Sequence, residues 1–301
     1  MNVGFIGLGA MGLPMAKRVV GAGYQVHVAY HQHREPAEEL RALGAEVMRT
    51  ARDVAAAADV VITILPADAE LREVVFSSQG ILAGFSAGKV LIEMTSGTAM
   101  ALREVEAAVR GAGGEVLDAP VSGGTSAAAQ GTLTIMVGGA RQLLERCRSL
   151  LETMGTRVFH VGGVGQGKVT KMVNQALAAI HVLAIGETFA LGVKCGADPA
   201  ILYEVIKASS GYSRMMDLRL PGFLFEGMFE PGFRLDLMKK DVNLALESAH
   251  ALGVPLLITS SAAQIFAAAS AAGKGNQDFA AAAEFLANRA GIALNQAKGS
   301  P

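Results

Sequence analysis

The chain has little of several things that specialised proteins need. It contains no tryptophan, only two cysteines, 5% aromatic residues and 18% charged residues, and its formal net charge is -1. Two cysteines are too few for a disulfide scaffold, and Cys147 and Cys195 match no metal or redox spacing, so we predict free thiols and no metal site. Nucleic acid is not an expected partner, because the near-neutral charge lacks the basic excess that such binding needs.

Apolar residues are abundant instead, at 51% of 301 residues. That length and composition predict about two domains with a large core, and they argue against disorder. The apolar N-terminus is interrupted by glycines and has no basic region before it, so it is typical of a first strand rather than a secretory signal, and we predict a cytoplasmic protein. The most membrane-like stretch, 173–193, contains Asn174, Gln175, His181 and Glu187, so we predict a buried helix and no membrane partner.

Three glycines follow the first apolar segment, 3–6. They lie in Gly7-Leu8-Gly9-Ala10-Met11-Gly12, and a helix-compatible stretch comes next. In a strand–loop–helix unit the first glycine permits a tight turn, the second lets the backbone approach a pyrophosphate, and the third lets the helix pack on the strand. Free amides at the helix N-terminus would hold the phosphates. These six residues are therefore predicted to bind a dinucleotide; the alternative is a plain turn.

Strand candidates alternate with helix-like segments through the first half of the chain. The predicted strands are 3–6, 25–29, 60–64, 89–92, 116–117, 134–137 and 157–161, and the helices between them include 12–21, 36–43, 68–76 and 98–111. This alternation predicts an α/β fold of the Rossmann type, with a doubly wound parallel sheet. Ligands bind such a sheet at the carboxyl ends of its strands.

The pattern changes to helices alone near residue 162. Residues 166–193 form one long stretch that is apolar on nearly all sides, and further helices are predicted at 198–208, 213–227, 236–252, 255–272 and 278–289. We predict a Rossmann domain at 1–163, an interdomain helix at 164–193 and an all-helical substrate and oligomerisation domain at 194–292. Because a helix that is apolar all round must be buried all round, we expect a partner subunit to cover part of it in a homodimer or homotetramer.

Basic side chains follow the second predicted strand, where NAD-selective domains carry an acid. The segment after 25–29 reads Tyr30-His31-Gln32-His33-Arg34, and the first carboxylate is Glu35. His31 and Arg34 would attract a ribose 2′-phosphate, so we predict NADP(H) as the preferred cofactor, with NAD(H) possible. The alternative is a solvated loop whose basic character has no function.

Three further segments join the glycine loop in order along the chain. They are Asp118-Ala119-Pro120-Val121-Ser122-Gly123-Gly124; Gly165-Gln166-Gly167, which leads into Lys171-Met172-Val173-Asn174-Gln175; and Phe233, which precedes Lys239-Lys240-Asp241. These motifs resemble those of the β-hydroxyacid dehydrogenase family, and the resemblance covers essentially the whole chain. The resemblance implies an NAD(P)-dependent oxidoreductase that acts on the CH–OH group of a small carboxylate, moving a hydride between the cofactor and a β-hydroxyacid or its semialdehyde.

The resemblance also implies roles for individual residues. The family's catalytic lysine matches Lys171, and the neighbouring amide matches Asn174. Its loop for the substrate carboxylate matches Ser122, Gly123 and Gly124. The contacts near the nicotinamide match Leu65, Pro66, Ser96 and Lys240.

These roles also make chemical sense from the residues alone. Lys171 and Asn174 are three apart on a helix and share a face, with Gln175 one turn from the lysine. Burial would favour the neutral amine and lower the pKa of Lys171 toward the working pH, as a general acid/base requires. The segment Ser122–Gly124 offers a hydroxyl and backbone amides to a carboxylate. Gln175 and Phe233 are assigned to the substrate site.

Each assignment has a plainer alternative. Lys171 could be a solvated helix lysine, the Ser122 loop an ordinary turn, Lys240 part of a charged helix start, and Phe233 part of the core. The pair Asn174-Gln175 is more like that of tartronate semialdehyde (2-hydroxy-3-oxopropionate) reductases than the two consecutive asparagines of many members. We therefore predict a reductase of that kind or a 2-(hydroxymethyl)glutarate dehydrogenase. The alternatives are a 3-hydroxyisobutyrate dehydrogenase, an imine reductase, or a non-catalytic dinucleotide-binding scaffold, and the lysine and amide pair counts against the last two.

Overall fold

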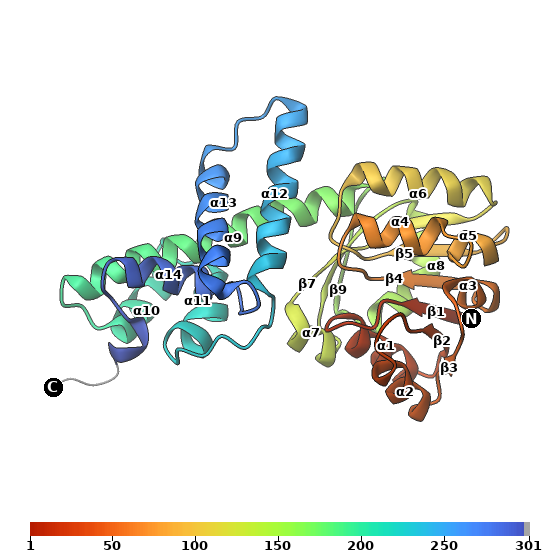
Figure 1. Ribbon diagram of the computed structural model, residues 1–301, viewed down its shortest axis with the longest axis horizontal. Coiled ribbons are helices and arrows are strands. Elements are labelled where there is room, and N and C mark those ends of the chain that lie inside the picture. Colours follow the sequence, from red (N-terminus) through yellow and green to blue (C-terminus); the bar gives the residue numbers. More distant parts are fainter. Residues whose placement is uncertain (298–301) are drawn as a thin grey trace. The chain divides into compact units, whose positions relative to one another are not determined.

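The computed structural model describes residues 1–297, and its contacts divide the chain into two compact units (Figure 1). The first unit, here the sheet unit, is Met1–Lys171, and the second, the helical unit, begins at Met172. The division falls inside α9, Gln166–Lys194, a single helix that occupies the segment predicted as interdomain.

The sheet unit alternates strands and helices from its first residues. Its elements are β1 (Asn2–Ile6), α1 (Gly12–Gly21), β2 (Gln25–Ala29), α2 (Glu35–Ala42), β3 (Glu46–Val47), α3 (Ala51–Ala57), β4 (Val60–Thr63), α4 (Asp68–Phe76), α5 (Ile81–Gly84), β5 (Val90–Glu93), α6 (Ala99–Gly111), β6 (Glu115–Asp118), β7 (Val121–Ser122), α7 (Gly124–Gln130), β8 (Thr134–Gly138), α8 (Arg141–Glu152) and β9 (Arg157–Gly162). All seven predicted strands are present, and the two-residue β3 and β7 are additions.

The strands form one sheet in the order β3-β2-β1-β4-β5-β6-β8-β7, with β9 paired to β8. The pairs from β3 to β6 are parallel, as predicted for a Rossmann fold. The expectation of a parallel sheet is wrong at β8, which runs antiparallel to both β6 and β7. Ser122 pairs with Thr134 across this junction, and only the seven-residue α7 lies in the connection. Such a connection turns the chain back, whereas a parallel pair needs a longer crossover.

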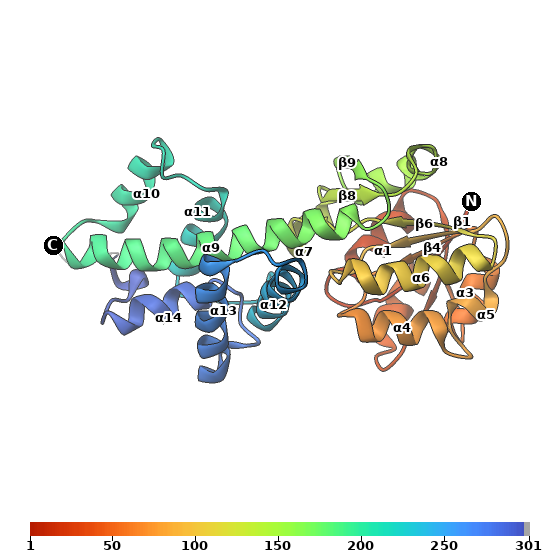
Figure 2. The ribbon, with the colours of Figure 1, turned by 90° about the horizontal axis from the view of Figure 1, so that it is seen from above.

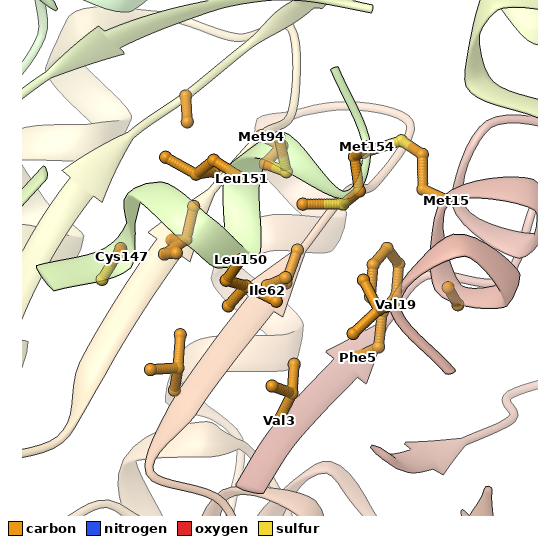
Figure 3. Packing of buried hydrophobic residues seen from close by; sticks show 14 of the residues in the cluster. Val3, Phe5, Met15, Val19, Ile62, Met94, Cys147, Leu150, Leu151 and Met154 are labelled. Carbon is orange, nitrogen blue, oxygen red and sulfur yellow. The ribbon is translucent and has the colours of Figure 1, made fainter. Parts of the chain in front are cut away.

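Helices cover both faces of the sheet, and alternate strand residues face each layer. Val3, Phe5 and Ile62 are fully buried against α1, α2 and α8, where Met15 and Val19 meet them (Figure 3). The opposite strand positions pack against α3, α4, α5 and α6, and Figure 2 shows α4 and α6 side by side on that face. This period of two is the pattern of a sheet buried on both sides.

The two cysteines are free thiols with different surroundings. Cys147 lies in α8 inside the core, and burial raises its pKa to about 11. It is therefore a packing residue, since a thiol that is protonated at neutral pH is a poor nucleophile. Cys195 is exposed just beyond α9.

The helical unit has its own core. Beyond α9 it contains α10 (Pro199–Lys207), α11 (Arg214–Arg219), η1 (Leu220–Leu224), α12 (Leu235–Leu252), α13 (Leu257–Ala269), η2 (Ser270–Lys274), α14 (Ala281–Arg289) and η3 (Leu294–Ala297). Gly186 on α9 explains how closely two of these helices pack, because a Cβ there would lie 2.7 Å from Cβ of Ala283 on α14. The predicted helices at 213–227 and 255–272 each include a π-helical turn at their carboxyl end.

In the single chain α9 is not buried all round, which leaves room for the predicted partner subunit to cover part of it. Val173, Leu177 and Leu191 remain 52%, 50% and 66% exposed, respectively. By length and hydropathy alone, α9 is also long and apolar enough to cross a membrane, as a core helix of a soluble protein can be. Hydrophobic periodicity predicts that a face is covered but does not say by what, so the partner subunit stays a prediction.

Candidate active site

Each glycine of the first loop has a different steric environment. At Gly7, with φ +102°, an added Cβ would lie 2.1 Å from the carbonyl oxygen of Ile64. At Gly12 it would lie 1.7 Å from the carbonyl oxygen of Gly7, so the start of α1 is packed directly on the loop. At Gly9 it would meet nothing within 4 Å. The fold thus requires Gly7 and Gly12, whereas Gly9 borders open space, as the approach of a pyrophosphate requires.

The N-terminus of α1 is electrostatically open to an anion. Its first turn contains no acidic residue, and no side chain caps it. The partial positive charge of the helix end is therefore not neutralised by a carboxylate of its own first turn. Together with the space at Gly9, this fits the pyrophosphate of a dinucleotide.

The residues after β2 form an exposed basic corner at the start of α2. Arg34 donates from Nε to Oε1 of Glu38 at 2.7 Å, and its guanidinium lies 5.8 Å from the ring centroid of Tyr30. The hydrogen bond raises the pKa of Arg34 and lowers the pKa of Glu38. Arg41 also pairs with Glu38, at 2.9 Å, so one carboxylate is shared by two cations. His31 is also exposed. The first turn of α2 carries Glu35 as well as Glu38, so the two arginines are matched by two carboxylates.

The loops after β4 and β5 are joined at the carboxyl edge of the sheet. Leu65 donates its amide to Oγ1 of Thr95 at 3.0 Å. Asp68 accepts from the hydroxyl of Thr98 at 2.7 Å and from its amide. These bonds flank the predicted nicotinamide-side residues, Leu65 and Pro66 on one loop and Ser96 on the other, so the two loops form one supported ledge.

Two buried carboxylates at this edge hold the first turn of α9. Asp118, the last residue of β6, accepts from the amides of Gly165 at 2.8 Å and Lys168 at 2.9 Å. Burial raises the pKa of Asp118, and these two amides and the ammonium of Lys168 partly offset that rise. Glu93, the last residue of β5, forms an ion pair with the ammonium of Lys168, which also donates to the carbonyl oxygen of Thr95.

Sequence reasoning did not single out Glu93 or Lys168. The available signal was local, since a single charge ends the apolar run Val90-Leu91-Ile92-Glu93. An unpaired carboxylate is not expected at the end of a strand buried on both faces, so a cationic partner was implied. Nothing in the sequence says that this partner lies on a helix far along the chain.

The predicted carboxylate loop follows the end of β6. Ser122 closes β7 and is half-buried, and the next two residues, Gly123 and Gly124, have φ of +138° and +71°. Residues other than glycine rarely adopt such φ angles, so the backbone geometry requires both glycines. The residues predicted for these loops thus all follow strand ends of the sheet unit. They are Gly7–Gly12, Leu65, Pro66, Ser96 and Ser122–Gly124.

Lys171 is the last residue of the sheet unit and is buried, at 7% exposed. It lies one helical turn after Lys168, the residue anchored to the sheet edge. The solvated-lysine alternative is therefore not supported for Lys171.

In the helical unit, the predicted amides and second lysine are linked. Asn174 donates from Nδ2 to Oε1 of Gln175 at 3.1 Å, and Gln175 donates from Nε2 to Oδ2 of Asp241 at 2.8 Å. Nζ of Lys240 lies 3.2 Å from Oδ1 of Asp241. Asp241 is thus the centre of the group, and the buried Gln175 supports Asn174.

Phe233 lies at the entrance to α12 and outside that group. Its amide donates to Oδ2 of Asp278 at 3.0 Å, and its ring meets Phe279 edge-on, with centroids 6.1 Å apart. Asp278 also pairs with Arg219, whose guanidinium stacks 4.4 Å from the centroid of Phe279. The backbone at Phe233 is therefore held by a buried ion pair.

Among residues 1–297, no three histidine, cysteine, aspartate or glutamate side chains gather as a metal site would need.

Two models of known protein families together match most of the chain. Residues 2–162 match the family model for the NAD binding domain of 6-phosphogluconate dehydrogenase. Residues 165–286 match the model for the NAD-binding domain of NADP-dependent 3-hydroxyisobutyrate dehydrogenase.

Individual relatives extend over nearly the whole chain. The chain is 36% identical to 2-(hydroxymethyl)glutarate dehydrogenase of Eubacterium barkeri, over 98% of each chain. It is 37% identical to 2-hydroxy-3-oxopropionate reductase of Escherichia coli, over 96% of this chain and 99% of that one. The solved structure of 3-hydroxyisobutyrate dehydrogenase from Mycobacterium tuberculosis with L-serine superposes with a TM-score of 0.85, at 34% identity over 95% of this chain and 98% of that one.

The fold and its glycine loop define a dinucleotide-dependent oxidoreductase. The chain belongs to the β-hydroxyacid dehydrogenase family, whose members use NAD(P) and act on CH–OH groups. This confirms the family, the fold class and the reaction class that the sequence motifs predicted.

Proposed function

We propose that this enzyme interconverts a small β-hydroxyacid and its semialdehyde, with 2-hydroxy-3-oxopropionate or 2-(hydroxymethyl)glutarate as the kind of substrate. The observation that carries the proposal is the burial of Lys171 one turn beyond a helix start anchored to the carboxyl edge of the sheet. Buried lysines are uncommon, and proton transfer to a carbonyl oxygen is chemistry that a lysine in this position suits.

The chemistry divides simply among the groups. NAD(P), when bound, supplies or accepts the hydride. Lys171 donates a proton to the carbonyl oxygen during reduction and removes it from the hydroxyl during oxidation. Ser122 and the amides of Gly123 and Gly124 bind the substrate carboxylate. Asn174, supported by Gln175 and Asp241, orients the lysine or the substrate.

The cofactor preference follows from the basic corner at the start of α2. Replacing Arg34 by Ala is expected to raise the Kd of NADPH by about ten- to a hundred-fold, because hydrogen bonds to charged groups contribute about 1.5–3 kcal/mol. The Kd of NADH is expected to stay within about twofold, since NADH has no 2′-phosphate to lose. Titration of both cofactors by fluorescence measures the two constants.

Two further variants sharpen this test. Arg41→Ala removes the other cation that pairs with Glu38, two turns along α2, and should spare NADPH binding. Glu38→Gln releases Arg34 from its carboxylate partner and should tighten NADPH binding. Wild-type protein that binds NADH more tightly than NADPH would contradict the preference.

We further propose a cytoplasmic homodimer or homotetramer. The apolar side chains that α9 leaves exposed, Val173, Leu177 and Leu191, support an oligomer, because burying exposed apolar surface favours association. The two cysteines, Cys147 and Cys195, are free thiols, which fits a reducing compartment.

A substrate panel tests the proposed reaction. Purified enzyme is assayed with NADPH and NADH in parallel against 2-hydroxy-3-oxopropionate, 2-(hydroxymethyl)glutarate, 3-hydroxyisobutyrate and a cyclic imine, following absorbance of the reduced nicotinamide. We expect the highest kcat/KM with one of the first two and with NADPH. Highest turnover with 3-hydroxyisobutyrate would select the alternative named by one family model. Turnover of the imine alone, or of none of them, would reject the proposal.

A further inference from the structure

The ion pair between Lys168 and Glu93 is the most deeply buried in the sheet unit. The lysine side chain is 1% exposed and the glutamate side chain 0% exposed. Removing two charges from water is costly, and a buried ion pair is often no more stabilising than well-packed apolar side chains of the same volume. Stability of the sheet unit therefore does not by itself explain the pair.

The pair connects three separate segments through one residue, Thr95. Lys168 donates to the carbonyl oxygen of Thr95, and Glu93 accepts from the amide of Thr95 at 2.8 Å. The hydroxyl of Thr95 accepts from the amide of Leu65. One ammonium on α9 thus fixes the end of β5, and through Thr95 it fixes the loop after β4.

The first turn of α9 is held a second time, by Asp118. The carboxylate accepts hydrogen bonds from the amides of Gly165, just before that turn, and of Lys168 within it. Gly167 brings the turn close, because a Cβ there would lie 2.5 Å from the carbonyl oxygen of Met136. Lys171 is three residues beyond Lys168 and shares its helix face. The position of Lys171 is therefore set by the two anchors of the preceding turn.

We propose that Lys168 and Glu93 are positioning residues that fix Lys171 relative to the ledge formed by Leu65, Pro66 and Ser96. The inference rests on the proposed role of Lys171, and it adds that the buried pair sets the geometry of proton and hydride transfer. A small displacement of a reacting group costs rate while leaving binding largely intact, so the pair acts on kcat.

The decisive variant is the charge-neutral double substitution Glu93→Leu with Lys168→Met. It removes both charges together and so avoids the unpaired buried charge that either single change leaves. We expect the double variant to fold with a thermal midpoint close to that of the wild type. We expect kcat to fall about tenfold or more, and the Kd of NADPH to stay within about threefold.

Two variants serve as controls. Leu150→Ala opens a cavity in the core of the same unit, away from the sheet edge, and shows what lowered stability alone does to kcat. Glu93→Gln keeps an oxygen that can accept from Thr95 or Lys168, so it should retain more of kcat than the double variant does. A kcat in the double variant within about twofold of the wild type overturns the inference, and so does a loss of kcat no larger than that of Leu150→Ala.

Hydrogen exchange supplies a readout that needs no turnover. In the double variant the amides of Leu65 and Thr95 should exchange faster, because their shared anchor is gone, whereas amides in the middle of β4 should not. Unchanged exchange at Leu65 and Thr95 overturns the anchoring. Full activity in Lys171→Ala would instead refute the proposed acid/base role, so the two failures are distinguishable.

Discussion

Lys171→Ala is expected to lower kcat by about a hundred-fold or more, since general acid–base groups contribute about 10²–10⁴-fold. NADPH binding should stay near the wild-type value, because the proposed role of Lys171 is in proton transfer and not in holding the cofactor. The variant should still fold, because alanine, the best helix former, takes the place of Lys171 in α9. Steady-state kinetics with NADPH, a cofactor titration and a thermal melt measure the three quantities.

Two other substitutions separate proton transfer from charge. Lys194→Ala changes an exposed lysine at the other end of the same helix and should leave kcat unaltered. Lys171→Arg keeps a positive charge but cannot release a proton, so it should be nearly as impaired as the alanine variant. If the arginine variant recovered most of the activity, Lys171 would act as a fixed charge. Full activity in Lys171→Ala would show that it has no catalytic role.

The parts of the fold that were predictable are those encoded in neighbouring residues. The alternation that places Val3 and Phe5 on one face of β1 is local, and so is the strand–loop–helix context of Gly7 to Gly12. Two-residue strands such as β3 and β7 carry no periodicity and were not recognised. The antiparallel β8 depends on where a short connection returns the chain, which hydrophobic pattern does not record.

The candidate site was predictable to the same extent. Helical spacing placed Lys171 and Asn174 on one face, and the resemblance added Lys240 to the predicted site. The supporting residues were not identified, since Lys168 contacts Glu93 across 75 positions and Gln175 contacts Asp241 across 66. Gln175 was assigned to the substrate, and it stays so assigned as a prediction, although both ends of its amide already bind protein groups. Polar networks of this kind depend on three-dimensional neighbours that a sequence pattern does not contain.

The glycine loop allows cofactor binding to be separated from folding by changing one methyl group at a time. Gly12→Ala is expected to destabilise the protein by about 3 kcal/mol or more, because the new Cβ would overlap a backbone oxygen that cannot move aside as a flexible side chain can. Urea or thermal unfolding measures this loss. A Gly12→Ala protein of wild-type stability would mean that α1 does not pack on the loop as closely as the 1.7 Å approach requires.

Gly9→Ala should have the opposite character. Its φ lies outside the left-handed region and its Cβ would meet nothing within 4 Å, so the free protein should be as stable as the wild type or more stable by about 0.4–1 kcal/mol. The same methyl group would occupy the space through which a pyrophosphate reaches the amides of α1, so the Kd of NADPH should rise at least about tenfold, or about 1.4 kcal/mol. NADH should weaken by the same factor, because both cofactors share the pyrophosphate, which distinguishes this variant from Arg34→Ala. A Gly9→Ala protein that binds both cofactors normally would place the pyrophosphate elsewhere and remove the basis for the cofactor site.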